Sequence, residues 1–173
     1  MCSKRLMVTV LIGIIPMLAI ADDAPTLGQP VSAEEINTIS LTVLPDGQGL
    51  PEGTGTAKNG EPIYAAQCAS CHGVKGVGGP LIPMAGKPKR GTDWTVGTVY
   101  EYATSIFDYV RRAMPAFTPK RLSNEEVYSI TAYVLYLNGL VEIDTPIDRQ
   151  TLPKIVMPAA AYSRNKWEEG KKL

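Results

Sequence analysis

Two stretches of the chain repeat apolar residues at the three- and four-residue spacing of an amphipathic helix. Their apolar positions are Val99, Ala103, Ile106 and Val110 in the first, and Val127, Ile130, Val134 and Leu137 in the second. The first stretch opens with a capping-box pattern, Thr98 and Glu101. The second opens with Ser123 and Glu126 in the same pattern, and Asn138-Gly139 ends it. The pattern predicts two helices whose apolar stripes face a core.

A third helix is predicted over residues 60–71. Pro62 fits its first turn if Asn59 is the N-cap, because the N–H that proline lacks has no partner there. Small and aromatic residues on this helix, Gly60 and Tyr64, are expected to cross the last helix near Tyr133 and Leu137. Residues 73–91 hold many glycines and prolines and are predicted to form a loop.

The segments on either side of these helices are rich in proline and glycine and show no long period. They either wrap the helical domain or dock onto another chain. The sequence therefore predicts one all-α domain of three main helices with extended Pro/Gly-rich N- and C-terminal segments. Its expected parts are a signal peptide (1–21), an extended N-terminal segment (22–55), the helical domain (56–141) and an irregular C-terminal tail (142–173).

The N-terminus has the pattern of an export signal. Lys4 and Arg5 precede an apolar run over residues 6–18, which is too short to span a bilayer. Small residues at 19–21 match a cleavage site, so we expect a mature chain that begins near Asp22 in the periplasm and has no membrane span. The alternative is that the apolar run is retained as a membrane anchor.

Charge excludes one class of partner. The whole chain carries 17 basic and 17 acidic residues, and removal of the signal peptide takes away two basic ones, Lys4 and Arg5. The mature chain is then slightly acidic, without the basic excess of a nucleic-acid-binding protein.

Cysteine spacing is the most informative signal. Cys2 leaves with the signal peptide, and Cys68 and Cys71 remain, followed at once by His72. Cys-x-x-Cys-His is the attachment motif of c-type haem, in which two thiols bind one porphyrin edge and the histidine binds the iron. A thioredoxin-like site would need a preceding strand, and a zinc site would need two further ligands. The motif therefore predicts one covalent haem c.

Composition also limits the second axial ligand of the iron. His72 is the one histidine in the sequence, so the choices are a methionine, a less common donor such as lysine, or an open position. The methionines of the mature chain are Met84, Met114 and Met157. We favour Met114, because Pro115 ends the preceding helix there and turns the side chain out of regular structure. The predicted cofactor-binding residues are thus Cys68, Cys71, His72 and Met114, with His72 and Met114 as metal ligands.

The loop after the motif is expected to fold around the proximal edge of the haem. A backbone carbonyl near Pro83 would accept the ring N–H of His72 and fix its tautomer. Five basic residues are either a solvated surface or groups that neutralise haem propionates or attract an acidic partner. They are Lys87, Lys89, Arg90, Arg111 and Arg112.

Helix, haem motif, loop, methionine turn and terminal helix together resemble the class I cytochrome c fold. Three segments resemble the cytochrome subunit of the bacterial sulfane and sulfite dehydrogenases of sulfur oxidation. They are PDGQGLPEGTGT at 45–56, YATSIFDYVRRAMP at 102–115 and LPKIVMP at 152–158. The resemblance implies Cys68 and Cys71 as thioether attachments, His72 and Met114 as axial ligands, and a molybdenum-cofactor subunit as partner. Some sulfane dehydrogenase cytochromes carry two haem domains and this chain has one motif, which leaves the sulfur substrate open.

The function expected from these observations is transfer of single electrons, from a molybdenum-dependent sulfite or sulfane dehydrogenase to a downstream cytochrome or oxidase. The first alternative is a free-standing shuttle for another periplasmic dehydrogenase. The second is a haem enzyme or sensor, which needs a displaceable sixth ligand. No catalytic residue is predicted in this chain.

Overall fold

The computed structural model describes residues 28–86 and 95–161. These residues belong to two units, one that ends at Thr38 and one that begins at Ile39. The first unit contains nearly all of α1 (Ala33–Ile39), which begins where the Ser32 hydroxyl accepts a hydrogen bond from the Glu35 N–H at 3.1 Å. The predicted signal peptide, residues 1–21, lies outside the described residues.

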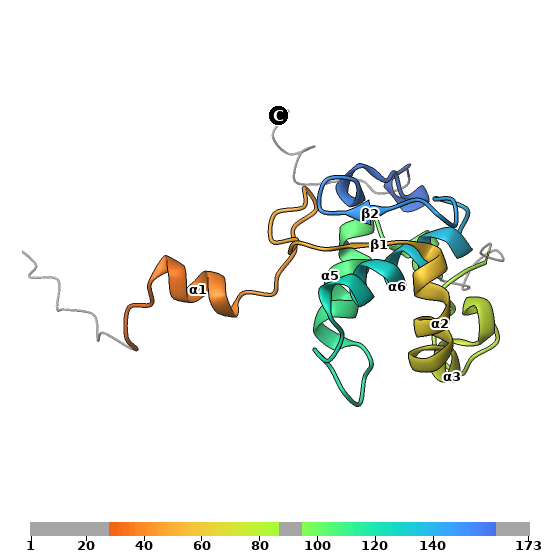
Figure 1. Cartoon of the computed structure of the whole chain (residues 1–173), viewed down its shortest axis with the longest axis horizontal. Helices are drawn as coiled ribbons and strands as arrows, with labels where there is room; N and C mark the ends of the chain where they lie inside the picture. The colour runs from red at the N-terminus through yellow and green to blue at the C-terminus, as the bar shows by residue number, and fades with distance from the viewer. Residues whose placement is uncertain (1–27, 87–94, 162–173) are drawn as a thin grey trace, which may run out of the picture. The chain divides into compact units, whose positions relative to one another are not determined.

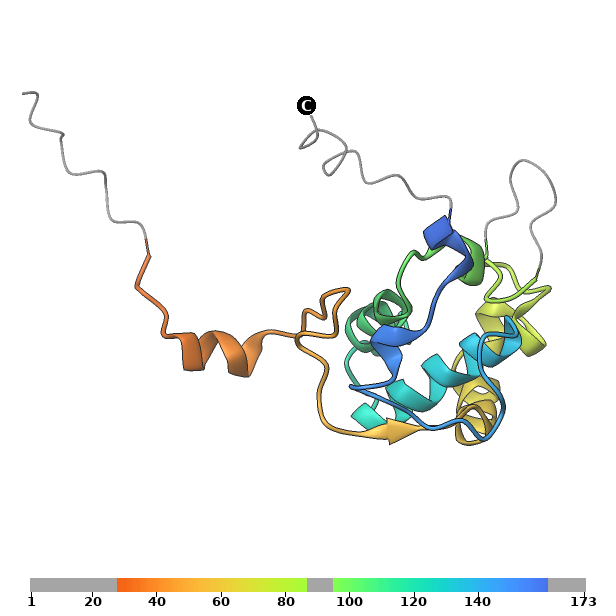
Figure 2. The ribbon, with the colours of Figure 1, turned by 90° about the horizontal axis from the view of Figure 1, so that it is seen from above.

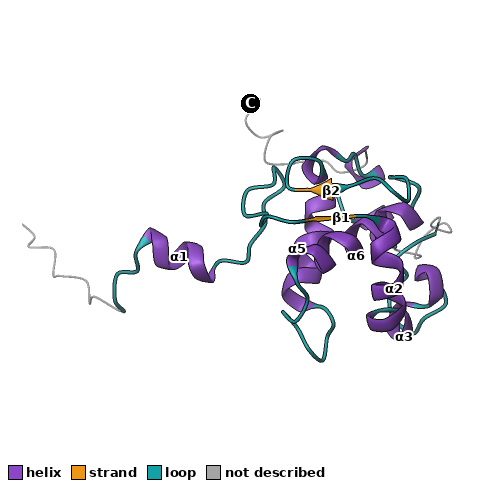
Figure 3. Ribbon diagram, in the orientation of Figure 1, coloured by secondary structure: helices purple, strands orange, loops and turns teal. Residues whose placement is uncertain are grey.

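The second unit is mainly helical, and its described residues include a small sheet of two antiparallel strands (Figures 1 and 3). Its elements are β1 (Thr54–Gly55), α2 (Ala57–Gln67), α3 (Ala69–His72), α4 (Val96–Val99), α5 (Ala103–Ala113), α6 (Asn124–Leu137) and β2 (Ile147–Asp148). Short 3₁₀ turns lie at Val74–Gly76, Leu152–Lys154 and Pro158–Ala161. The predicted all-α class is confirmed. In the described ranges, every helix is too short or too polar to cross a bilayer.

The core is built on the crossing of α2 and α6. A Cβ at Gly60 would overlap the backbone carbonyl of Ser129, so only glycine allows the two helices to approach this closely. One turn further along, the rings of Tyr64 and Tyr133 lie 5.2 Å apart and tilted, a favourable arrangement for two aromatic rings. The crossing predicted from these small and aromatic residues is confirmed.

The start of α2 differs from the prediction. The helix begins at Ala57, three residues before Gly60, because the Thr56 hydroxyl accepts a hydrogen bond from the Asn59 N–H at 3.2 Å. Pro62 therefore lies inside the helix rather than in its first turn. The helix breaks at Cys68, and the haem motif continues on α3.

The helix predicted after Thr98 is divided in two, and the capping box predicted there is wrong. Thr95 caps α4 instead, with its N–H donating to the Thr98 Oγ1 at 3.0 Å. Tyr100 is extended and ends α4, and Tyr102 pairs with Val156 in an isolated antiparallel bridge before α5 begins. The long-range bridge to the C-terminal segment overrides the local helix pattern at this point.

The capping box predicted for α6 is confirmed. The Glu126 N–H donates to the Ser123 hydroxyl at 3.2 Å, and the Ser123 N–H donates to the Glu126 carboxylate at 2.7 Å. Every residue of α6 from Val127 to Leu135 is buried, so this helix is enclosed by the rest of the unit. Tyr128 packs on Phe107 of α5 with ring centroids 4.4 Å apart.

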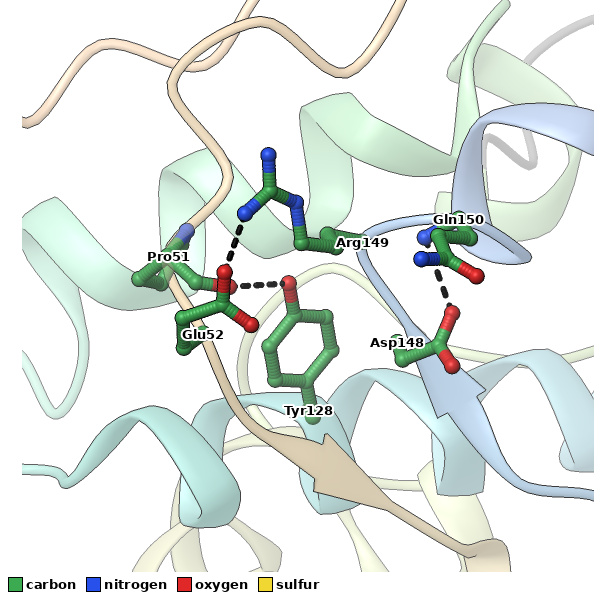
Figure 4. Close-up of polar contacts among 6 residues, drawn as sticks. All are labelled: Pro51, Glu52, Tyr128, Asp148, Arg149 and Gln150. Atoms are coloured by element: carbon green, nitrogen blue, oxygen red, sulfur yellow. Dashed lines mark hydrogen bonds and ion pairs between the residues drawn. The ribbon is translucent and has the colours of Figure 1, made fainter.

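Both flanking segments wrap α6. β1 pairs with β2, and the hydroxyl of Tyr128 donates to the Pro51 carbonyl at 2.9 Å (Figure 4). An ion pair joins Arg149 to Glu52 above the same strand pair. The C-terminal segment, blue in Figure 2, runs across α5 and α6. Three of its apolar side chains are fully buried; they are Ile147, Leu152 and Met157. Up to Ala161, the predicted irregular tail therefore has fixed structure on the helical core.

The first prediction concerns the α2–α6 crossing. Gly60→Val should lower the free energy of unfolding by at least about 2–3 kcal/mol, because the new side chain must displace the Ser129 backbone. Ala65→Val is the matched control, since Ala65 is an exposed residue of the same helix and its change tests helix propensity alone. Urea unfolding followed by circular dichroism measures both. Equal losses from the two variants would contradict the close crossing.

The second prediction concerns the turn after β2. The Asp148 carboxylate accepts hydrogen bonds from the Thr151 and Gln150 N–H groups, which lower its pKa. A lowered folded-state pKa stabilises the protein at pH values above the unfolded pKa, and this contribution is lost as pH falls through the folded value. Asp148→Asn should therefore cost about 0.5–1 kcal/mol at neutral pH, since solvent screens the charge and asparagine keeps one acceptor oxygen, and progressively less in acid.

The control for the turn is Asp144→Asn, which removes a carboxylate from an exposed ion pair with Lys58. Thermal unfolding of both variants and the parent between neutral and acidic pH gives the comparison. A loss of stability in Asp148→Asn that stays constant across this range would show that the turn does not depend on the carboxylate charge.

Candidate functional site

The haem motif occupies a single tight helical turn at the end of α2. The Cys71 and His72 N–H groups both donate to the Cys68 carbonyl, at 3.1 and 2.9 Å. Both thiols are free and half-buried, and His72 is buried, with 9% of its surface exposed. Three of the four predicted site residues are thus brought together with their backbone fixed by hydrogen bonds.

The imidazole of His72 is oriented by the loop that follows. Its Nδ1 lies 3.0 Å from the Ile82 carbonyl oxygen, so the Nδ1–H donates and Nε2 is left as the basic nitrogen of the ring. The prediction that a backbone carbonyl near Pro83 accepts this bond is confirmed, and the acceptor is the carbonyl of the preceding residue, Ile82. Such a bond fixes the tautomer and raises the basicity of the imidazole as a metal ligand.

The loop that follows the motif begins at Gly73, a position where the backbone requires glycine. Gly73 has φ +83°, and a Cβ there would overlap the Val77 backbone. The hydroxyl of Tyr64 donates to the Gly73 carbonyl at 3.3 Å, and the Leu81 N–H donates to the Cys71 carbonyl at 3.0 Å. The backbone on the C-terminal side of His72 is therefore tied both to α2 and to the motif itself.

The environment of the thiols favours attachment of a cofactor over thiol–disulfide exchange. Burial raises the pKa of Cys68 to about 11, and the neighbouring Cys71 adds to the rise. A thioredoxin-like site needs a thiol whose pKa is lowered, so that the thiolate can attack a disulfide. In residues 28–86 and 95–161, moreover, no group of three or more His, Cys, Asp or Glu side chains is placed to hold a metal ion alone. Two free thiols and one oriented imidazole on a turn fit a c-type haem.

Met114 lies where α5 ends. Its N–H donates to the Val110 carbonyl at 3.1 Å, but its own backbone is extended (φ −117°, ψ 147°), as expected of a residue before proline. The Thr118 N–H donates to the Pro115 carbonyl at 2.9 Å, which closes a turn just after it. The half-buried Met114 side chain thus extends from a backbone that hydrogen bonds fix on both sides. In Figure 1, this end of α5 lies toward the same end of the domain as α3.

The other two methionines have different surroundings. Met157 is 1% exposed and belongs to the apolar core, where it fills space. Met84 is partly buried against the same core, and its backbone is fixed on both sides, since its N–H donates to Gly76 and its carbonyl accepts from Asn138. The structure thus gives Met157 a packing role and leaves Met114 as the methionine at a helix break.

The hydrogen bonds of two polar residues, Asp108 and Asn138, were not predicted from the sequence. Asp108 on α5 is buried, accepts the Val43 N–H at 2.9 Å and forms an ion pair with Arg112. The spacing of four residues between Asp108 and Arg112 is a readable signal for such a pair. Arg112 is therefore partly neutralised within its own helix. Asn138, interpreted from the sequence only as a helix stop, bonds the loop after the haem motif. Lys87, Lys89 and Arg90 lie outside the described residues.

Comparison with known proteins identifies the family. The sequence profile described as "Cytochrome C oxidase, cbb3-type, subunit III" matches residues 55–134. Cytochrome c6 of Anabaena variabilis is 39% identical over 80 residues, which cover 44% of this chain and 86% of that protein. The cbb3-type cytochrome c oxidase subunit FixP of Azorhizobium caulinodans is 33% identical over 118 residues, 65% of this chain. The chain spans only 38% of the length of FixP.

A solved structure extends the match beyond the haem domain. The sulfane dehydrogenase SoxCD from Paracoccus pantotrophus is similar with a TM-score of 0.74 and 33% sequence identity, over 86% of this chain and 76% of that one. The fold seen here is therefore the class I cytochrome c fold, as its helix order and haem motif predicted. On the cytochrome c6 and SoxCD matches together, the chain belongs to the class I c-type cytochromes, electron-transfer proteins that bind haem covalently.

Proposed function

We propose that Cys68 and Cys71 attach one haem c through thioethers and that His72 and Met114 are its axial ligands. The observation that carries the proposal is the hydrogen bond from His72 Nδ1–H to the Ile82 carbonyl, which leaves Nε2 for the iron. When bound, the haem supplies a one-electron Fe(III)/Fe(II) couple, whose potential a methionine ligand raises.

The chain's own residues hold that couple in one geometry. Cys68 and Cys71 anchor the cofactor to a turn whose backbone is already bonded, so little rearrangement accompanies a change of charge. His72 is kept in one tautomer by the loop, and Met114 is held at the end of α5 by its own N–H bond. With both axial positions filled, the site has no place for a substrate, which suits electron transfer rather than catalysis.

We further propose that the protein is exported to the periplasm and is the cytochrome subunit of a molybdenum-dependent sulfite or sulfane dehydrogenase. Its similarity to the sulfane dehydrogenase structure supports this assignment. That similarity covers 86% of this chain, whereas the cytochrome c6 relative covers 44% of it. A free-standing haem shuttle would need only the domain that the cytochrome c6 relative covers.

The N-terminal helix α1 is the segment best suited to bind the dehydrogenase subunit. Both flanking segments around β1 and β2 wrap α6, and most of their large apolar residues are buried; they are Val43, Leu50, Ile147, Leu152 and Met157. On α1, Ile36 is 49% exposed and Ile39, one turn later, is 71% exposed. A seven-residue helix is marginal in water, and an apolar surface on a partner would stabilise it.

The third prediction tests the axial methionine. Oxidised protein should show the weak far-red sulfur-to-iron absorption band, and Met114→Ala should remove it. Met84→Leu and Met157→Leu are the controls, with leucine chosen because it keeps the volume that Met157 fills in the core. Loss of the band in a control variant, with its survival in Met114→Ala, would assign the ligand elsewhere.

The fourth prediction tests the partnership. Sulfite should reduce the isolated cytochrome at a negligible rate, because the chain has no proposed site for two-electron oxygen transfer. With the cognate molybdenum dehydrogenase subunit added, sulfite or a related sulfur compound should reduce it quickly. Stopped-flow spectroscopy gives both rates. Rapid reduction of the lone cytochrome by sulfite would refute this division of labour, and no reduction with the subunit present would favour the free-standing shuttle.

The proposed role of α1 is tested by measuring how tightly variants of this helix bind the same dehydrogenase subunit. Changing both Ile36 and Ile39 to Glu should weaken binding to the dehydrogenase subunit by about tenfold or more, since buried apolar anchors dominate such interfaces. Val156→Glu is the matched control, because Val156 is 79% exposed on the haem domain. If the double change instead lowers the melting temperature of the lone cytochrome and leaves binding intact, α1 belongs to the fold and not to the interface.

A further inference from the structure

Asn138, the residue at the end of α6, joins two parts of the structure through one side chain. Its Nδ2 donates to the Val134 carbonyl of its own helix at 2.7 Å and to the Met84 carbonyl of the haem loop at 2.8 Å. Both N–H donors of the amide are therefore used. One bond closes the last turn of α6, and the other fixes a loop that lies 54 residues earlier in the sequence.

The orientation of this amide is fixed by its neighbour on α4. A Cβ at Gly97 would overlap the Asn138 side-chain carboxamide, so the buried glycine packs directly against it. α4 also bonds the same loop, since the Val96 N–H donates to the Pro83 carbonyl at 3.1 Å. Two consecutive carbonyls of the loop are thus bonded by different helices: Pro83 by the backbone of α4 and Met84 by the Asn138 side chain at the end of α6.

The carbonyl just before these two is the one that His72 uses. Ile82 accepts the Nδ1–H at 3.0 Å, and its backbone has no helix or strand to fix it. In the described loop, the Leu81 N–H donates to the Cys71 carbonyl, and the Met84 and Ala85 N–H groups donate to the Gly76 carbonyl at 2.9 and 3.2 Å. Two side chains also bond carbonyls of this loop: Asn138 at Met84, and the Thr95 hydroxyl at Gly86 at 3.4 Å. The bond from Asn138 is the nearer of the two to Ile82, and it can be removed without changing the backbone.

We propose that Asn138 is a positioning residue that sets the strength of the bond from His72 Nδ1–H to Ile82, and thereby the reduction potential of the haem. The proposal rests on His72 as an axial ligand. A strong bond at Nδ1 gives the imidazole more anionic character and makes it a better donor to the oxidised iron. Release of Met84 lets the Ile82 carbonyl move away, which weakens that donation. The potential then rises, because the oxidised state loses stabilisation.

Two variants test this in the full-length holoprotein. Asn138→Leu keeps the approximate shape of the side chain without adding a charge and removes both donors, and Asn138→Ala removes the side chain beyond Cβ. In either variant, the exchange of the His72 ring N–H with solvent should be about fivefold to tenfold faster, and the reduction potential should rise. Nuclear magnetic resonance of the reduced protein, labelled with nitrogen-15 histidine, follows one residue, since His72 is the only histidine in the sequence. Spectroelectrochemical titration gives the potential.

Gly139→Ala is the matched control, because Gly139 has φ +70° and nothing within 4 Å of its missing Cβ. It should lower the melting temperature through strain at the end of α6 without changing the ring N–H exchange or the potential. Asn138 variants that lose stability as this control does, with exchange and potential unchanged, would overturn the proposal. So would a shift of potential without faster exchange. A failure of the underlying ligation would appear in the parent protein, whose His72 signals would lack the ring-current shift of an iron ligand.

Discussion

The close approach of α2 and α6 at Gly60 and Ser129 is the constraint on which the rest of the structure depends. α2 runs directly into the haem motif, and α6 ends at Asn138, which bonds the loop that orients His72. The crossing therefore fixes α2, which leads into the turn with the two thiols. It also fixes α6, whose last residue, Asn138, supports the loop that orients the His72 imidazole. Any side chain larger than hydrogen at position 60 would separate the two helices and loosen both ends together.

The flanking segments act on the same helix pair. Because β1 pairs with β2 and Tyr128 bonds Pro51, residues before α2 and after α6 close around α6 and bury it completely from Val127 to Leu135. A rigid haem domain follows from this, which suits a protein whose task is to change charge with little change of shape. Through this wrapping, segments far apart in the sequence share one apolar core with α5 and α6.

The features that the sequence predicts well are those with short-range signals. The Cys68–His72 motif, the capping box at Ser123 and the Gly60 crossing each depend on spacing within one turn or on a single small residue. The break between α4 and α5 was not predictable in this way, because it follows from the bridge between Tyr102 and Val156, far apart in the sequence. Likewise, Ile147, Leu152 and Met157 are buried at five-residue intervals, which match neither a helix nor a strand. The role of Asn138 required the position of Met84, which only the tertiary structure gives.

In the ligation proposed above, His72 and Met114 fill both axial positions of the haem, so that the protein transfers electrons and binds no substrate at the iron. Titration of the reduced holoprotein with carbon monoxide, followed by its visible absorption spectrum, tests this most directly. We expect the spectrum to stay unchanged at carbon monoxide concentrations that saturate open haem sites, because Met114 keeps its position on the iron. Stoichiometric formation of a carbon monoxide complex by the parent protein would show a displaceable sixth ligand and would favour a haem enzyme or sensor.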